Sequence, residues 1–245
     1  MIARYDANVE LNSFDFFGWL AQVAAMGATE IVFDLPARFS VEQQIRFGSI
    51  IVPGPAMLGL KHSFGNEGPT LASSRFRHLC AWARAHGPNF PRLRNIYDKP
   101  GPYPFTVTMR EQKTKPDRNS DQEVWRTFAD EIGAIVIEDY DRKPIHVFER
   151  MQLYAGARMN FGIVSGPLVM CSLSIYPCVT FGWRWAWGNG FYEKAGINYG
   201  DPMPWLGHNQ FSLWEVPTLA FLRRWFAEWS KANAATRADP VSHAF

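Results

Sequence analysis

Polar and charged side chains follow several apolar runs of this chain at the point where each run ends. Arg110 follows the run 105–109, Glu138 closes the run 134–138, and Ser165 and Gly166 come just after the run 158–163. If these runs are parallel strands, their carboxyl ends lie along one edge of a sheet, where ligands bind in folds of this kind. Arginines and free backbone N–H groups bind anions, and carboxylates accept protons. The spacing therefore predicts a ligand site at that edge.

The segment Ser165-Gly166-Pro167 is the first candidate. It joins a predicted strand to the apolar run Leu168–Met170, which predicts a helix starting at the turn. Proline is tolerated at the first helical position, and glycine lets a backbone approach a ligand closely. The N–H groups of such a turn suit a diphosphate. A plain turn with Ser165 as the helix cap explains the same residues.

The second candidate is the charged segment Arg110-Glu111-Gln112-Lys113, followed by Arg118. Arg110 and Lys113 follow a predicted strand and could hold phosphates through charge and hydrogen bonds, with Glu111 beside them. The alternative is a solvated charged loop without a ligand. Arg110 fits this alternative least well, because it comes directly after the strand.

The third candidate is acidic: Glu138, Asp139 and Asp141 stand at the end of another predicted strand. Asp139 and Asp141 form an Asp-x-Asp pair that could hold Mg²⁺ or Mn²⁺ on a diphosphate. Glu138 or Asp139 could instead accept a hydrogen bond from a ribose or a nucleobase. An acidic surface turn without a ligand is the third possibility.

Asp15 is the candidate proton acceptor. It lies in the first turn predicted for the helix 14–26, from which it would point toward the second half of the chain. A carboxylate in partly apolar surroundings can act as a general base. It could also simply complement the helix dipole. Asp34 and His62 are other candidates for the base.

Strands and helices alternate along the chain. The predicted strands are 2–5, 29–34, 57–62, 105–109, 134–138, 158–163 and 178–181. The predicted helices are 14–26, 40–47, 73–86, 120–132, 148–156, 167–174 and 218–232. Residues 87–104 contain five prolines, which predicts a connector. We therefore expect an α/β fold of two Rossmann-like parallel sheets facing a cleft, with residues 1–95 as the acceptor-side domain and 96–245 as the ligand-binding domain.

Composition sets limits on the class of protein. The 245 residues carry 25 Lys+Arg against 23 Asp+Glu, a net charge of +2, which excludes a strongly basic nucleic-acid module. The three cysteines show no CxxC spacing, so we expect neither a disulfide framework nor structural zinc. The uncharged run 159–183 is cut by Gly162, Gly166, Pro167 and Pro177 into pieces too short for a membrane span. Together with an N-terminus lacking an apolar stretch, this predicts a cytoplasmic protein.

The second half resembles the donor half of GT-B-type glycosyltransferases, in particular heptosyltransferase-like enzymes of bacterial glycan synthesis. The resemblance covers roughly residues 104–230 and is carried by the run 148–157, by Asn160-Phe161-Gly162, by Ser165-Gly166-Pro167 and by the Arg110 and Arg118-Asn119-Ser120 segments. A looser match in the first half involves Tyr5-Asp6 and Phe14-Asp15-Phe16. Leu168 stands where a histidine often follows the Ser-Gly-Pro turn, and the chain is short for this family.

The resemblance implies transfer of a sugar from a nucleoside-diphosphate sugar to a hydroxyl acceptor such as a glycan. Ser165, Gly166 and Arg110 would then stabilise the diphosphate leaving group, and Asp15 would take the acceptor proton. No cofactor is required, and the final helix would brace the two halves.

Three other functions fit the same residues. A GT-A transferase would use Asp139 and Asp141 with Mg²⁺ or Mn²⁺, a nucleotide-sugar epimerase would convert the donor without an acceptor, and a binding protein would leave the donor intact. A nucleic-acid acceptor gains no support from the near-neutral charge.

Overall fold

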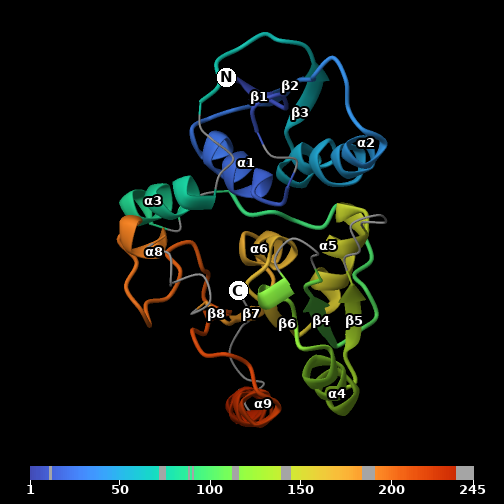
Figure 1. Cartoon of the computed structure of the whole chain (residues 1–245), viewed down its shortest axis with the longest axis vertical. Helices are drawn as coiled ribbons and strands as arrows, with labels where there is room; N and C mark the ends of the chain where they lie inside the picture. The colour runs from blue at the N-terminus through green and yellow to red at the C-terminus, as the bar shows by residue number, and fades with distance from the viewer. Residues whose placement is uncertain are drawn as a thin grey trace, which may run out of the picture.

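The chain forms two parallel β-sheets in a computed structural model (Figure 1). The structure describes residues 1–10, 13–71, 76–87, 89, 91–111, 116–138, 145–183 and 191–235. The first sheet lies within residues 1–95 and the second within 96–245. The predicted α/β class with two Rossmann-like sheets is confirmed. Among these residues, no helix has both the length and the apolar character that crossing a membrane requires.

The first half contains a three-stranded sheet with the order β1-β2-β3. Its elements are β1 (Ile2–Asp6), α1 (Phe16–Ala25), β2 (Glu30–Asp34), α2 (Val41–Arg46), the π-helical turn η1 (Phe47–Ile51), the 3-10 helix η2 (Gly54–Leu58), β3 (Lys61–Phe64) and α3 (Phe76–His86). A capping box begins α2, because Ser40 Oγ accepts from the Gln43 N–H and Gln43 Oε1 accepts from the Ser40 N–H. This reciprocal pair explains why the helix begins at Val41.

The third strand was predicted too early. A strand from residue 57 was expected, but residues 54–58 form the 3-10 helix η2 and β3 starts at Lys61. Pro53 and Pro55 fix backbone angles that suit a helical turn, and Gly59 ends the turn with a φ of 70°. The strand can begin only after that reversal.

The second half contains a five-stranded sheet with the order β5-β4-β6-β7-β8. Its elements are β4 (Phe105–Met109), η3 (Pro116–Arg118), α4 (Gln122–Ile132), β5 (Ile135–Glu138), α5 (Val147–Gly156), β6 (Met159–Ile163), α6 (Gly166–Ser172), β7 (Cys178–Phe181), α8 (Phe191–Lys194), β8 (Gln210–Ser212) and α9 (Leu219–Ala235). Sequence patterns missed β8, which has only three residues and no apolar run. The strand β5 lies at the edge of the sheet and is half-buried.

Asp121, not Asn119 or Ser120, caps α4. Its Oδ1 accepts a hydrogen bond from the Val124 N–H at 3.1 Å. The hydroxyl of Ser120 makes a different contact, because it accepts a hydrogen bond from the backbone N–H of Arg110. All three residue types favour this position, so local sequence could not choose among them.

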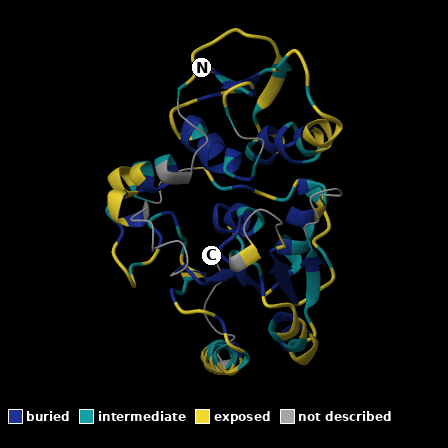
Figure 2. Ribbon diagram, in the orientation of Figure 1, coloured by how far each residue is buried: buried dark blue, intermediate teal, exposed yellow. Residues whose placement is uncertain are grey.

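Helices cover both faces of the second sheet, and α5 and α6 lie on the face toward the first half (Figure 1). The apolar residues of this face share one continuous core with α1 and the first sheet. The opposite face packs against α4 and α9 in a separate core. Figure 2 shows β4 buried and β3 exposed. The halves are thus packed together where a cleft was expected.

In the part that the structure describes, the final helix packs on the second sheet, whereas a position across the two halves was predicted. The ring of Phe226 lies 5.3 Å from that of Phe105, and the ring of Trp225 lies 6.0 Å from that of Phe181. The described apolar side chains of α9 therefore cover the second sheet. The contacts between the halves come from α1, which packs against α6, from α3, which packs against α8, and from the connector, where the Leu93 N–H donates to Leu173 O.

Candidate functional site at the junction of the two halves

The order of strands in the second sheet defines where a ligand should bind. The chain leaves β4 toward α4 on one face, and it leaves β6 toward α6 on the other face. The strands β4 and β6 are neighbours, with Thr108 opposite Gly162. In such sheets the diverging loops open a crevice at the carboxyl ends of the two strands. Arg110 follows β4 and Ser165 follows β6, so the two predicted residues come together at this point.

Arg110 is held in place by the loop that follows it. Its N–H donates to Ser120 Oγ at 2.8 Å, and its carbonyl accepts from the Ser120 N–H at 2.9 Å. Its guanidinium donates to Asn119 Oδ1 at 3.2 Å and is buried, with 7% of the residue exposed. These bonds join Arg110 to Asn119 and Ser120 and hold its cation at the end of β4, where a solvated surface loop was the alternative.

Arg118, in η3, brings a second guanidinium to this loop. Its Nε is buried and has no hydrogen-bond partner among the described residues. A buried N–H of this kind costs free energy unless an acceptor occupies it, so it is a candidate ligand contact. Arg118 also acts electrostatically on Tyr192 of α8, favouring the ionised phenol.

Ser165 occupies the N-cap position of α6, but its side chain does not take part in capping. Its side chain makes no hydrogen bond to the helix, and its Oγ is buried without a hydrogen-bond partner in the described part of the chain. The residue is 6% exposed. The predicted N-cap position of Ser165 is thus confirmed, but its hydroxyl is not used for capping and is available to a ligand.

Gly166 and Pro167 make contacts within the protein. A Cβ on Gly166 would lie 2.8 Å from the Cβ of Phe14, which explains why the position needs a glycine. The carbonyl of Pro167 accepts a hydrogen bond from Tyr154 Oη at 3.4 Å. Phe14 of the first half thus packs directly on the turn at the end of β6, and any contact of Gly166 or Pro167 with a ligand stays a prediction.

Asp15 lies next to Phe14, immediately before α1, and makes no side-chain bond to the helix. Burial raises the pKa of its carboxyl from 3.8 to about 6, against an opposing hydrogen bond with Ser13. The carboxylate in turn contributes to the raised pKa of Cys80 in α3 and of Tyr192 in α8. Asp15 therefore lies among residues of both halves, and its pKa places it in the range useful for proton transfer near neutral pH.

Arg150 is a buried arginine whose position the sequence patterns did not use. Its guanidinium donates to Tyr154 Oη at 3.3 Å and lies 5.7 Å from the centre of the Phe14 ring. Tyr154 Oη is also 3.0 Å from Thr108 Oγ1 in β4. These contacts fix Phe14, and hence Asp15, against the second half. Helical spacing places Arg150 on the same face as buried Val147 and Tyr154, and this was the signal that could have revealed it.

The other predicted ligand residues lie apart from this cluster or outside the described residues. Glu111 is exposed, and Glu138 forms an ion pair with Arg126 of α4. Lys113, Asp139 and Asp141 lie outside the described residues. Within the described ranges, no three His, Cys, Asp or Glu side chains group as a metal site.

Two alternative bases are placed elsewhere. The Asp34 carboxylate lies 3.7 Å from the Arg4 guanidinium, and His62 is exposed on β3. Neither joins the cluster around Asp15.

The chain matches no protein-family model, no curated protein and no solved structure. Two arginines lie in the segment that follows β4, a serine hydroxyl without a hydrogen-bond partner among the described residues follows β6, and a carboxyl of raised pKa lies next to Phe14, which packs on the turn after β6. These groups can neutralise an anionic leaving group and accept a proton.

Proposed function

We propose that the chain is a glycosyltransferase, which moves a sugar from a nucleoside-diphosphate sugar to a hydroxyl acceptor. The observation that carries this proposal is the position of Asp15. A carboxyl with a pKa of about 6 comes from the first half, and its neighbour Phe14 packs on the turn at the switch point of the second sheet. A proton acceptor thus stands beside the edge where a phosphate-bearing ligand binds in such sheets.

The leaving diphosphate is assigned to Arg110, Arg118 and Ser165. Guanidinium groups bind phosphate oxygens through charge and paired N–H groups, and Asn119 and Ser120 hold Arg110 before a ligand arrives. The buried Nε of Arg118 and the buried Oγ of Ser165 would gain hydrogen-bond partners. Such preorganised donors stabilise charge that develops in the transition state.

The transfer step is a substitution at the anomeric carbon. The acceptor oxygen forms a bond to that carbon while the bond to the diphosphate oxygen breaks, and the bonding electrons leave with the diphosphate. The acceptor proton passes to the Asp15 carboxylate. With a pKa of about 6, most of this carboxylate is ionised above pH 7 and can accept the proton.

The direct test measures donor binding and nucleoside-diphosphate release with a panel of UDP-, GDP-, ADP- and CMP-linked sugars and simple glycan acceptors. We expect Asp15→Asn to bind the donor like the native chain and to transfer about 10²–10⁴-fold more slowly. Glu111→Gln, an exposed carboxylate on the neighbouring loop, is the matched control and should leave the rate unchanged.

An unchanged rate in Asp15→Asn would remove Asp15 from the mechanism. Donor binding without turnover would instead favour a binding protein, and donor conversion without an acceptor would favour an epimerase. Loss of activity in EDTA, restored by Mn²⁺, would favour the metal-dependent transfer predicted for Asp139 and Asp141.

A further inference from the structure

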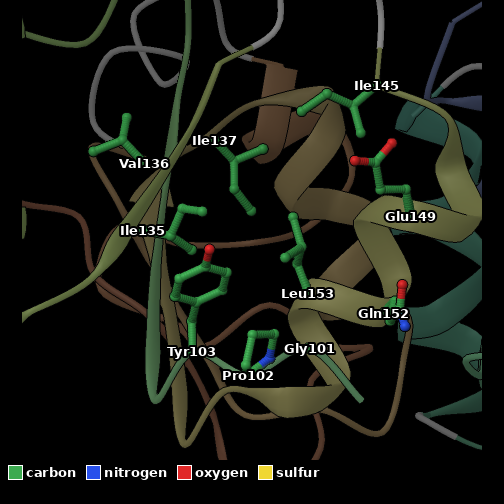
Figure 3. A pocket seen from close by; sticks show the side chains of 10 residues that line it. All are labelled: Gly101, Pro102, Tyr103, Ile135, Val136, Ile137, Ile145, Glu149, Gln152 and Leu153. Atoms are coloured by element: carbon green, nitrogen blue, oxygen red, sulfur yellow. The ribbon is translucent and has the colours of Figure 1, made fainter. Parts of the chain in front are cut away.

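A pocket of about 400 Å³ lies along the outer edge of the second sheet, away from the junction cluster. Figure 3 shows its three walls: β5 on one side, α5 on the other and residues 101–103 at one end. Glu149 and Ile145 lie at the opposite end. The volume falls within the range of small-molecule sites in proteins.

The closed end of the pocket is firmly built. The Gly101 N–H donates to Gln152 O at 2.7 Å, and Gln152 Nε2 donates to Lys99 O at 2.9 Å. A Cβ on Gly156 would lie 1.8 Å from Gly101 O, so the loop and the helix can touch here only because residue 156 is a glycine. Backbone contacts between Gly101 and α5 therefore hold this end of the pocket together.

Most side chains that line the pocket are apolar, although polar atoms form a large share of its surface, and Glu149 carries the only charge among the described lining residues. Ile135 and Ile137 of β5 face Leu153 of α5, and the ring of Tyr103 closes the end. The charge is the carboxylate of Glu149, which repels phosphates and accepts hydrogen bonds from hydroxyl or amino groups. The pocket thus suits a flat, uncharged body with hydrogen-bond donors at one end.

The position of Glu149 links this pocket to the junction. It lies in the first turn of α5, and the next residue, Arg150, stacks on Phe14 beside the turn that follows β6. The last residues of α5 instead touch Gly101, ahead of the start of β4. The Glu149 end of the pocket is therefore the end nearer to the carboxyl ends of the strands, where Arg110 lies.

We propose that this pocket binds the nucleoside of the donor, with the base between β5 and Leu153 and the ribose hydroxyls at Glu149. The inference rests on the proposed function and names the part of the donor that this part of the chain recognises. The base gains apolar contact with both walls, and the outer edge of β5, which no described strand pairs, offers backbone groups to its polar edge. The phosphates of the donor lie outside this pocket, on the side of Arg110 and Arg118.

The test compares variants of residues proposed to contact the nucleoside of the donor with a variant of a residue proposed to contact its diphosphate. Binding of adenosine, guanosine, cytidine and uridine and of their 5′-diphosphates is measured by calorimetry. Leu153→Trp fills the pocket and should weaken the preferred nucleoside at least about tenfold. Glu149→Gln, at an exposed position, should weaken it about three- to tenfold and should have no effect on the 2′,3′-dideoxynucleoside. Leu35→Trp, at an exposed leucine, is the matched control.

Arg118→Gln separates this inference from the proposed function. This variant should lose most of the extra affinity that the diphosphate gives to the nucleotide. Its affinity for the free nucleoside should stay unchanged. Diphosphate binding that both pocket variants leave intact would overturn the nucleoside site and leave the glycosyltransferase proposal standing. Nucleoside binding with no gain from the diphosphate would overturn the diphosphate site alone. Binding of an apolar alcohol such as farnesol, with no nucleoside bound, would overturn the nucleoside assignment.

Discussion

The two halves of the molecule differ in how much core each can form by itself. The second sheet has helices on both faces, and the core under α4 and α9 consists of second-half residues alone. The first sheet has three strands, an exposed strand at its edge, and a helix layer whose core continues into α5 and α6. The first half therefore depends on the second for part of its apolar burial.

This difference bears on the proposed site. The proposed diphosphate-binding residues Arg110 and Ser165 follow buried strands of the second half and are positioned by that half's own fold. The first half supplies a carboxyl just before α1, among residues of both halves. The raised pKa of Asp15 is thus a consequence of packing the halves together.

The largest expected effect is on the free energy of unfolding, through the core under α4 and α9 that consists of second-half residues alone. Phe128 is fully buried between Phe161 and Phe226, at ring distances of 5.3 and 6.0 Å. Phe128→Ala should lower the free energy of unfolding by about 3–5 kcal/mol, measured by urea denaturation. Phe64→Ala, at the exposed edge strand β3, should change it by no more than about 0.5 kcal/mol.

Hydrogen exchange would show whether the first half depends on the second. Amides of the first sheet should exchange no more slowly than those of β4 and β6 in the native chain. In Phe128→Ala, the amides of the second sheet should exchange faster. If the amides of the first sheet then stayed protected from exchange, the first half would not depend on the second.

The next effect concerns Asp15 and stability. The folded pKa of about 6 lies above the ordinary value of 3.8, so the folded state holds the proton more tightly than the unfolded state. Ionisation therefore costs stability as the pH rises from 3.8 to about 6, and the full cost of roughly 3 kcal/mol remains above that range. Asp15→Asn removes the charge and should stabilise the chain by up to this amount at pH 7.5.

The same variant should bring little stabilisation at pH 3, where the Asp15 carboxyl is largely protonated in both the folded and the unfolded state of the native chain. Urea unfolding at the two pH values measures the difference. Equal effects at both pH values would mean that the carboxyl is not desolvated in the folded chain.

Sequence patterns predicted most elements of the fold because strong local signals set them. The strands 105–109 and 178–181 were predicted at their observed bounds, since apolar runs end at clear breaks. The errors came where local signals compete or are weak. Two prolines turned part of a predicted strand into η2, and β8 is too short to show a pattern.

The site was predictable in part for the same reason. Arg110 and Ser165 follow strands, so topology alone brings them together. The roles of Arg150 and Phe14 depend on how two distant segments pack, and no local pattern contains that information. Gly166 shows the limit most clearly, because its glycine is required by Phe14, 152 positions earlier in the chain.

Gly166 gives the third prediction, which tests the contact between the halves. A Cβ at this position would lie 2.8 Å from Phe14 Cβ and 3.2 Å from Phe14 Cδ2. Gly166→Ala should therefore cost about 1–3 kcal/mol of stability, because the Phe14 backbone end must shift. In a Phe14→Ala background the same substitution should cost much less, and additive costs in the double variant would contradict the contact.

The smallest effect is on the pKa of Asp15 itself. The hydrogen bond with Ser13 lowers that pKa against the larger effect of burial. Ser13→Ala should raise it by about half a unit to one unit, because one stabilising bond to the ionised form is lost. The acid limb of the pH–rate profile, or the ¹³C resonance of the carboxyl, should move to higher pH. Ser13→Thr keeps the hydroxyl and should leave the midpoint in place. A downward shift in Ser13→Ala would mean that the loss of Ser13 lets water reach the carboxyl, so that solvation outweighs the missing bond.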